Sequence, residues 1–286
     1  MTVVLICVGA AKAGTSWLHS QLAEHPECHF RAIKELHYFS AFESGRSGAE
    51  LAKHRDIQAE MLDRFARSGM RPTDEQAARL SDRANWLDVL ETKRENVRAY
   101  LRYLETGAGQ AKVVGEMTPA YALLSEERLV RIARMAPDVR ILYLMREPVD
   151  RLWSHIRMIA ARRDGQGRVT ARRCDKILNR VIEGDEDQIA KRSDYASALT
   201  KLLAAIPAGK LLIEVFEDMI AGDAFARICD FLGIARVEPN RVPVHEGQPL
   251  DMTAAQRDTA TAWLAPQYDA AAQVLGGLPD AWSRKG

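Results

Sequence analysis

Four short runs of aliphatic and β-branched residues recur along the chain, and each predicts a buried β-strand. They occupy residues 3–8 (VVLICV), 112–115 (KVVG), 139–145 (VRILYLM) and 210–216 (KLLIEVF). Because these runs are continuously apolar rather than alternating, they are typical of strands buried on both faces of a parallel sheet.

Helical patterns separate the predicted strands. Apolar residues at helical spacing begin near Thr15 and stop before Pro26; Ser125 is an N-cap candidate for a second helix, and a third is expected at about 194–206. Alternating strands and helices predict an α/β fold, a three-layer sandwich around a central, mainly parallel sheet. The ligand of such a fold lies beyond the C-terminal ends of the strands.

Two segments depart from this alternation. Residues 50–106 are charged, carry an apolar stripe at helical spacing and contain no strand pattern, so they predict an inserted helical segment. Residues 160–192 are polar, contain glycine and hold blocks of charge, which predicts a mobile surface loop or a lid over the site. We expect residues 1–286 to form a single domain around these features.

Charge and cysteine content narrow the classes of partner. The chain has 40 Lys and Arg against 39 Asp and Glu, so no overall field attracts nucleic acid or an anionic membrane, and any anion site must be local. The four cysteines form no CxxC pair, which argues against a disulfide framework or a zinc site and favours a reducing cytoplasm. The opening lacks a basic leader, and no stretch is long enough to span a bilayer.

The stretch VGAAKAGTSWL, residues 8–18, is a candidate anion-binding loop between the first strand and the first helix. At such a turn, backbone N–H groups and the helix dipole converge on an anion. Gly9 and Gly14 have the spacing of the phosphate-binding GxxxxGK[ST] loop, but Lys12 precedes the second glycine instead of following it. The loop therefore predicts that Lys12 contacts the bound anion from a different direction than the lysine of a GxxxxGK[ST] loop does.

A second candidate lies in YLMREPVDRLWSHIRM, residues 143–158. Arg146 ends a predicted strand, and Ser154 lies about two turns into the helix that follows. Both side chains can bind a second phosphate, and Arg146 alone would be read as a structural ion pair. Two anion sites at successive strand ends imply a ligand with two separated anionic groups.

Together these stretches resemble the sulfotransferases, most closely the heparan-sulfate-type and related bacterial carbohydrate enzymes. KAGTSWL resembles their 5′-phosphosulfate loop and REPVDRLWS their 3′-phosphate motif, RxPxxRxxS. The likeness covers about the first 230 residues and continues through KELHYF (34–39), GEMTPAY (115–121), RSDYASAL (192–199) and LLIEVFEDM (211–219). It implies the cosubstrate 3′-phosphoadenosine-5′-phosphosulfate (PAPS) and the product adenosine 3′,5′-bisphosphate, with a carbohydrate or small-molecule acceptor.

The resemblance also implies roles for individual residues. Lys12 stabilises the bridging oxygen, and Trp17 and Tyr195 match nucleotide-contacting aromatic residues, although a core position explains Trp17 equally well. The nucleotide contacts implied are Lys12, Ala13, Gly14, Thr15, Ser16, Trp17, Arg146, Ser154 and Tyr195. Glu35, after a short second strand, matches the general base, and His37 is the rival for that role. The sequence shows no clear metal cluster, so we expect no metal requirement.

Some family features are missing. Met117 stands where many heparan-sulfate-type enzymes have a second lysine, so Lys34 or another cation replaces it, or Lys12 acts alone. The glycine-rich C-terminal loop that covers the nucleotide in many relatives has no clear counterpart; residues 236–286, with Arg241, His245 and Lys285, are weak candidates for another cover.

The sequence leaves the acceptor and the oligomeric state open. A local basic groove is possible around Arg162, Arg163, Arg172 and Arg173. The competing functions are an ATP-dependent kinase, disfavoured by the order of Lys12 and Gly14, and a non-catalytic nucleotide-binding regulator, disfavoured by the presence of Lys12 and Glu35.

Overall fold

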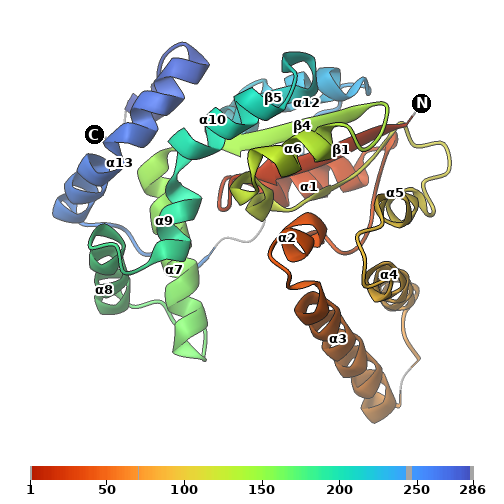
Figure 1. Cartoon of the computed structure of the whole chain (residues 1–286). Helices are drawn as coiled ribbons and strands as arrows, with labels where there is room; N and C mark the ends of the chain where they lie inside the picture. The colour runs from red at the N-terminus through yellow and green to blue at the C-terminus, as the bar shows by residue number, and fades with distance from the viewer. Residues whose placement is uncertain (1, 70, 243–246, 284–286) are drawn as a thin grey trace.

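A five-stranded parallel sheet forms the centre of the chain in the computed structural model, which describes residues 2–69, 71–242 and 247–283 (Figure 1). The strand order is β2-β3-β1-β4-β5, and every neighbouring pair is parallel. The strands are β1 (Val3–Gly9), β2 (Cys28–Phe30), β3 (Val113–Met117), β4 (Val139–Met145) and β5 (Leu211–Val215). All four apolar runs are strands, as the sequence predicts.

Helices cover both faces of the sheet, which confirms the α/β sandwich. Helices α6 (Glu126–Ala133) and α10 (Tyr195–Ala205) lie in front of β1 and β4 in Figure 1, while α1 (Thr15–Glu24) and α12 (Ala224–Leu232) lie behind. Every residue of β1 is buried, because this strand is central and covered on both faces. Ser125 caps α6 as predicted, since its side chain accepts a hydrogen bond from the Arg128 N–H.

Two groups of helices extend below the sheet on opposite sides (Figure 1). The first holds α2 (Tyr38–Glu43), α3 (Ser47–Ser68), α4 (Asp74–Glu91) and α5 (Val97–Glu105), so the segment predicted as a helical insertion is helical and its described residues, 50–69 and 71–106, contain no strand. The second holds α7 (Pro148–Asp164), α8 (Ala171–Ile182) and α9 (Asp187–Ser193). Helix α13 (Ala254–Leu275) packs against α7, α8 and α10 and rises beside the sheet at the left of Figure 1. The short elements are η1 (Pro119–Leu123), η2 (Ala208–Lys210), α11 (Phe216–Ala221) and α14 (Asp280–Ser283).

The prediction of a loop over residues 160–192 is wrong, because most of this segment is helical, whereas its alternative role as a lid over the site stays a prediction. Four residues of α8 at helical spacing are buried against α7 and α13: Cys174, Ile177, Leu178 and Val181. The charged residues of these blocks pair with one another: Asp164 forms an ion pair with Arg173, and Glu186 forms one with Arg163. The apolar spacing in α8 is a stronger signal than the charges and glycines on which the prediction of a loop rests.

Among the described residues, no helix combines the length and the apolar character that crossing a lipid bilayer would require.

Candidate active site

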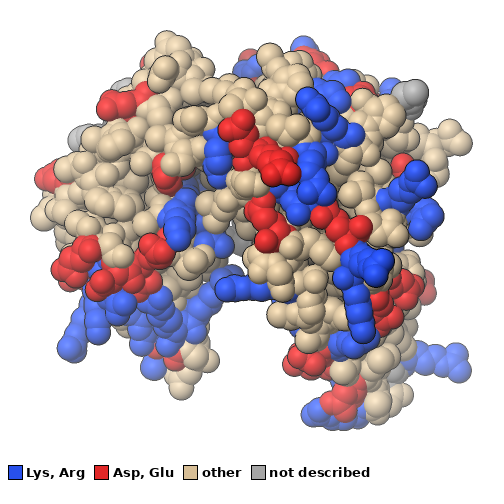
Figure 2. All heavy atoms as spheres, in the orientation of Figure 1, with Lys and Arg blue, Asp and Glu red and all other residues tan. Residues whose placement is uncertain are grey.

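A cavity of about 1430 Å³ opens where the C-terminal ends of β1 and β4 meet the two groups of helices. It is larger than the roughly 300–1,000 Å³ of most small-molecule sites, so it has room for two substrates. Figure 2 shows the hollow between the two lower parts of the molecule, with Lys and Arg along its edge. Among the described residues, its lining carries two carboxylates, Glu35 and Glu186, and nine cations: Lys12, Lys34, Lys53, Arg146, Arg157, Arg162, Arg163, Arg192 and Arg241.

The loop after β1 exposes backbone N–H groups to this cavity. Gly14 has a φ of 85° and precedes α1, and a Cβ there would collide with the ring of Phe216, so only glycine fits. No side chain caps α1, and its first turn contains no acidic residue. The first-turn amides and the positive end of the helix dipole are therefore available to an anion.

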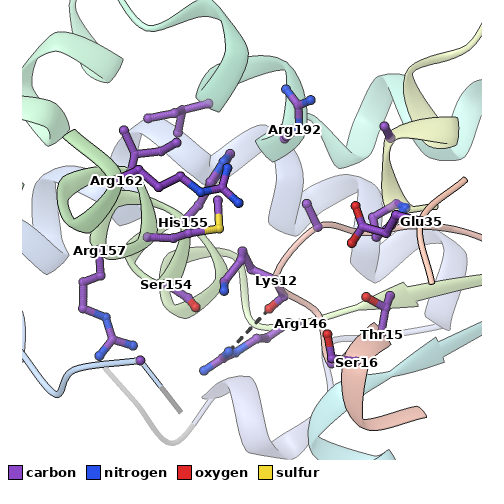
Figure 3. A pocket seen from close by; sticks show the side chains of 18 of the residues that line it. Lys12, Thr15, Ser16, Glu35, Arg146, Ser154, His155, Arg157, Arg162 and Arg192 are labelled. Atoms are coloured by element: carbon purple, nitrogen blue, oxygen red, sulfur yellow. Dashed lines mark hydrogen bonds between the residues drawn. The ribbon is translucent and has the colours of Figure 1, made fainter. Parts of the chain in front are cut away.

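Lys12 occupies the centre of the site (Figure 3). Burial lowers the pKa of its ammonium, and the neighbouring cations Arg146, Arg157, Arg162 and Lys34 lower it further. Within the part of the chain that the structure describes, Lys12 forms no ion pair, since no carboxylate lies within 4.0 Å of its ammonium. A cluster of like charges that includes a half-buried lysine is stabilised by binding an anion.

Lys34 brings a second cation to the same loop. Its Nζ donates hydrogen bonds to Thr15 Oγ1 at 3.2 Å and to Glu35 Oε1 at 3.2 Å. Met117, at the position of the missing family lysine, is completely buried in β3 and has no access to the cavity. Of the alternatives that the sequence left open, the geometry favours Lys34 as the second cation.

Glu35 and His37 lie side by side on the wall next to Lys34. The Glu35 Oε2 atom is 3.4 Å from His37 Nε2, and 43% of the Glu35 side chain is exposed. Partial burial opposes ionisation, but hydrogen bonds from His37 and Lys34 and their charges outweigh it and lower the pKa of Glu35 to about 2. Both candidate bases therefore face the cavity, and Glu35 is held as a carboxylate.

Glu116 anchors this wall from inside the protein, a role that the sequence did not reveal. Its buried carboxylate accepts hydrogen bonds from the hydroxyls of Tyr100 at 2.6 Å, Tyr121 at 2.8 Å and Thr118 at 2.6 Å. It also accepts the backbone N–H of Leu36 at 3.2 Å. Burial raises the pKa of Glu116, while these donors work in the opposite direction. The network fixes the backbone between Glu35 and His37.

Arg146 marks the second cation group, at the end of β4. Tyr195 OH donates to the Arg146 carbonyl at 2.8 Å and accepts its N–H at 3.1 Å. Tyr195 is completely buried and absent from the cavity lining, so the predicted direct contact with a nucleotide is corrected: this tyrosine positions Arg146. The Arg146 guanidinium lies over the Phe216 ring at 5.0 Å, and its Nε has no hydrogen-bond partner among the described residues.

Ser154 and Arg157 complete this group on one face of α7. They are three residues apart, which places them side by side on a helix, and Figure 3 shows both near Arg146. Arg157 donates to the Gln248 carbonyl at 2.9 Å, and its Nε is buried and unpartnered in the described structure. Arg157 was not among the predicted site residues, although its spacing of three residues from Ser154 places both on one face of a helix. Arg241 also lines the cavity, whereas His245 and Lys285 lie outside the described residues.

Arg151 adds positive charge behind the loop. It is completely buried, donates to the Ala11 carbonyl at 3.3 Å and bonds to the Ser193 hydroxyl. No carboxylate of the described residues forms an ion pair with it, and burial lowers its pKa. The resulting positive field extends toward the loop.

Comparison with known proteins assigns the family. The sequence profile described as "Sulfotransferase family" matches residues 5–239. The chain belongs to the sulfotransferase family. A search of curated proteins finds no match for it.

Solved sulfotransferases share the fold of this sulfotransferase. The enzyme from Alicyclobacillus acidocaldarius is 22% identical, with a TM-score of 0.63 and coverage of 99% of both chains. The sulfotransferase domain of the Synechococcus PCC 7002 olefin synthase is 16% identical, with a TM-score of 0.53, covering 98% of this chain and 96% of that one. The sulfotransferase domain of the curacin biosynthetic pathway is also 16% identical, with a TM-score of 0.55, covering 97% and 99%.

The remaining predicted contacts of the sulfotransferase differ in how much they face its cavity. Thr15 and Ser16 line it. Trp17 reaches the lining but is only 3% exposed, because its indole N–H donates to the Asn240 carbonyl at 2.9 Å and its ring packs edge-on against Phe225. Ala13 is completely buried and does not line the cavity, so its side chain belongs to the core. Base stacking on Trp17 stays a prediction.

No group of three or more His, Cys, Asp or Glu side chains in the described parts of the sulfotransferase is arranged to hold a metal ion.

Proposed function

We propose that this sulfotransferase transfers the sulfuryl group of PAPS to a hydroxyl, or less readily an amine, of a carbohydrate or small metabolite. Family membership supports sulfuryl transfer in general. The observation that carries the choice of donor is the presence of two adjoining cation groups, Lys12 with Lys34 and Arg146 with Arg157, which meet where Arg146 Nη1 donates to the Lys12 carbonyl at 3.4 Å. PAPS has two separate anionic ends, and each group suits one of them.

The loop suits the phosphosulfate end. First-turn amides of α1 and the hydroxyls of Thr15 and Ser16 bind the 5′-phosphate, while Lys12 faces the bridging oxygen. Charge builds on that oxygen as its bond to sulfur breaks, and a fixed ammonium stabilises it without reorganisation. Lys34, on Thr15, adds a second positive charge. Because the chain supplies this charge, we propose that the reaction requires no metal.

Arg146, Ser154 and Arg157 suit the 3′-phosphate. Both guanidinium groups have a buried Nε without a partner in the described structure, and a phosphate oxygen supplies the missing acceptor. Tyr195 fixes the Arg146 backbone, and Gln248 holds Arg157. Trp153 also donates to the Leu250 carbonyl at 2.6 Å, so two backbone carbonyls hold residues 247–250 against α7. In this proposal, these residues form part of the cover over the nucleotide, for which the sequence offered only weak candidates.

Glu35 acts as the general base in this proposal. Its carboxylate takes the proton of the acceptor hydroxyl as the acceptor oxygen bonds to sulfur. The bond from sulfur to the bridging oxygen breaks, and its electron pair leaves with adenosine 3′,5′-bisphosphate. His37 orients the Glu35 carboxylate through their 3.4 Å contact. Full activity in a Glu35→Gln variant would transfer the role of base to His37.

Calorimetry with adenosine 3′,5′-bisphosphate and with ATP tests the proposed donor site. We expect micromolar affinity for the bisphosphate and an affinity for ATP that is at least about tenfold weaker, because ATP lacks the 3′-phosphate. Arg146→Ala should weaken bisphosphate binding by about 10–100-fold and leave adenosine 5′-monophosphate binding nearly unchanged. Micromolar binding of ATP with no binding of the bisphosphate would overturn the proposal in favour of a kinase. Labelled PAPS that is never consumed with any hydroxyl acceptor would instead indicate a regulator.

Lys34 is expected to control the ionisation of Glu35. In the Lys34→Gln variant the ammonium and its hydrogen bond are lost, so the pKa of Glu35 should rise from about 2 toward its ordinary value of 4.5. As the solution is acidified, the Glu35 carboxylate of the variant is then protonated, and the base is lost, at a higher pH than in the wild type. Carbon-13 NMR titration of the side-chain carboxyls measures this, with Glu35→Gln to assign the resonance. Lys112→Gln, which removes a lysine paired with Glu27 elsewhere, is the matched control. An unchanged midpoint in Lys34→Gln would contradict the prediction.

A further inference from the structure

Five of the described cations of the cavity are not used by the donor, and three of these have partners elsewhere: Lys53 pairs with Glu50, Arg163 pairs with Glu186, and Arg241 donates to the Ile220 carbonyl. Arg162 and Arg192 are the other two. Arg162 lies near the end of α7 and Arg192 near the end of α9, and both line the cavity. The Arg162 side chain makes no hydrogen bond or ion pair to any described residue. Arg192 bonds only to its own helix, where Nη1 donates to the Gln188 carbonyl at 3.0 Å and to Gln188 Oε1 at 2.8 Å.

Their neighbour Arg163, by contrast, has a carboxylate partner. It forms a two-pronged contact with Glu186, at 2.7 Å and 2.9 Å. Arg162 and Arg192 have no such carboxylate, and burial lowers the pKa of Arg192 while the carboxylate of Glu35 raises it. Glu35 and Arg192 both line this cavity. Two guanidinium groups that lack an anion are typical of a site for one.

The position of this pair separates it from the donor groups. Figure 3 shows Arg162 and Arg192 on one side of Lys12, with Arg146 and Arg157 on the other and Glu35 beside Lys12. Arg162 is still close enough to lower the pKa of Lys12. Because all four residues line one cavity, a molecule bound against this pair shares that cavity with Lys12 and Glu35, where the proposed sulfuryl transfer takes place.

We propose that the acceptor carries an anionic group, a carboxylate, a sulfate ester or a phosphate ester, which Arg162 and Arg192 bind while its hydroxyl faces Glu35. This inference rests on the proposed function. A guanidinium binds the oxygens of all three groups with paired hydrogen bonds, so the pair selects for the anion and not for the rest of the molecule. Fixing the anion at one wall holds the hydroxyl in line with the sulfur at the other.

The test uses the enzyme saturated with adenosine 3′,5′-bisphosphate, so that the donor cations are already occupied. The probes are methyl β-glucuronide, methyl β-glucoside 6-sulfate and methyl β-glucoside 6-phosphate, with uncharged methyl β-glucoside for comparison. We expect at least one anionic glycoside to bind about tenfold or more tightly than the uncharged one in calorimetry. The rank of the three distinguishes which anion is preferred.

The variant R162Q/R192Q should lose this preference for charge and keep the bisphosphate affinity. The control R98Q/R172Q removes the same charge at two exposed arginines that do not line the cavity, and it should keep the preference. Equal binding of charged and uncharged glycosides, no binding of any anionic one, or a preference that survives in R162Q/R192Q would overturn the inference. A loss of bisphosphate affinity in R162Q/R192Q would also overturn it, by assigning the pair to the donor. Failure of the wild-type enzyme to bind bisphosphate would instead overturn the proposed function.

Discussion

Lys12→Ala is expected to lower the turnover of sulfuryl transfer by about 10²–10³-fold, the loss that follows removal of one donor to a developing oxyanion. The ammonium stands at the centre of the cavity and has no carboxylate within ion-pair distance among the described residues, so its charge is available to the leaving oxygen. Affinity for adenosine 3′,5′-bisphosphate should fall much less, because the loop amides and the Arg146 group remain. The measurement is single-turnover consumption of labelled PAPS with an acceptor found by screening.

Lys93→Ala is the matched control for Lys12→Ala. Both lysines have a positive φ, 70° for Lys12 and 53° for Lys93, so alanine meets the same backbone constraint at both positions. Lys93 is exposed and outside the cavity, and its variant should keep full activity. Equal activity of Lys12→Ala and the wild type would remove Lys12 from the transfer step and leave it only an electrostatic part in binding.

The sheet was predictable because its signals are local. A continuous apolar run such as that of β1 indicates burial on both faces in a central strand, whereas the similar run of β5, at the edge of the sheet, leaves Leu211, Leu212 and Ile213 only half-buried. The loop and the Arg146 segment could be read in the same way, since each follows a strand and opens a helix. Parallel strands bring their carboxyl ends to one edge, so the sequence alone predicts that both segments meet at one site.

The parts that escaped prediction depend on contacts between residues that are distant in sequence. Lys34 reaches the loop through Thr15, 19 residues earlier, and Glu116 reaches the Leu36 amide across 80 residues. Tyr195 was placed against the nucleotide by its motif, but packing turned its hydroxyl toward the Arg146 backbone 49 residues away. No spacing rule reports which way a buried hydroxyl points.

The helices of residues 160–192 were missed for a different reason. Their charged residues are partners for one another, as Arg163 is for Glu186, and these pairs stabilise the helical wall that carries Arg192. A block of mixed charge is compatible with a loop or with a helical surface, and only the apolar spacing distinguishes the two. The correction matters for function, because a helix fixes the guanidinium of Arg192 relative to Glu35 better than a mobile loop does.

Glu116→Ala is expected to lower the free energy of unfolding by about 3–5 kcal/mol. The change leaves the buried hydroxyls of Tyr100 and Tyr121 and the N–H of Leu36 without their acceptor, and it opens a cavity beside them. Urea denaturation measures the loss. Glu105→Ala, at an exposed carboxylate on the neighbouring α5, should change the stability by no more than about 0.5 kcal/mol.

Glu116→Gln separates the positioning of the catalytic wall from the stability of the fold. The amide keeps one acceptor oxygen and places an NH₂ group against donors, so the loss of stability should be smaller, about 1–2 kcal/mol, and the chain should stay folded. The segment from Glu35 to His37 is then held less firmly, since Leu36 N–H loses a charged acceptor. We expect kcat to fall while the affinity for bisphosphate is unchanged, because Glu116 touches neither cation group. A fall in stability with wild-type kcat would mean that Glu116 serves the core alone and that Lys34 and His37 suffice to hold Glu35 in place.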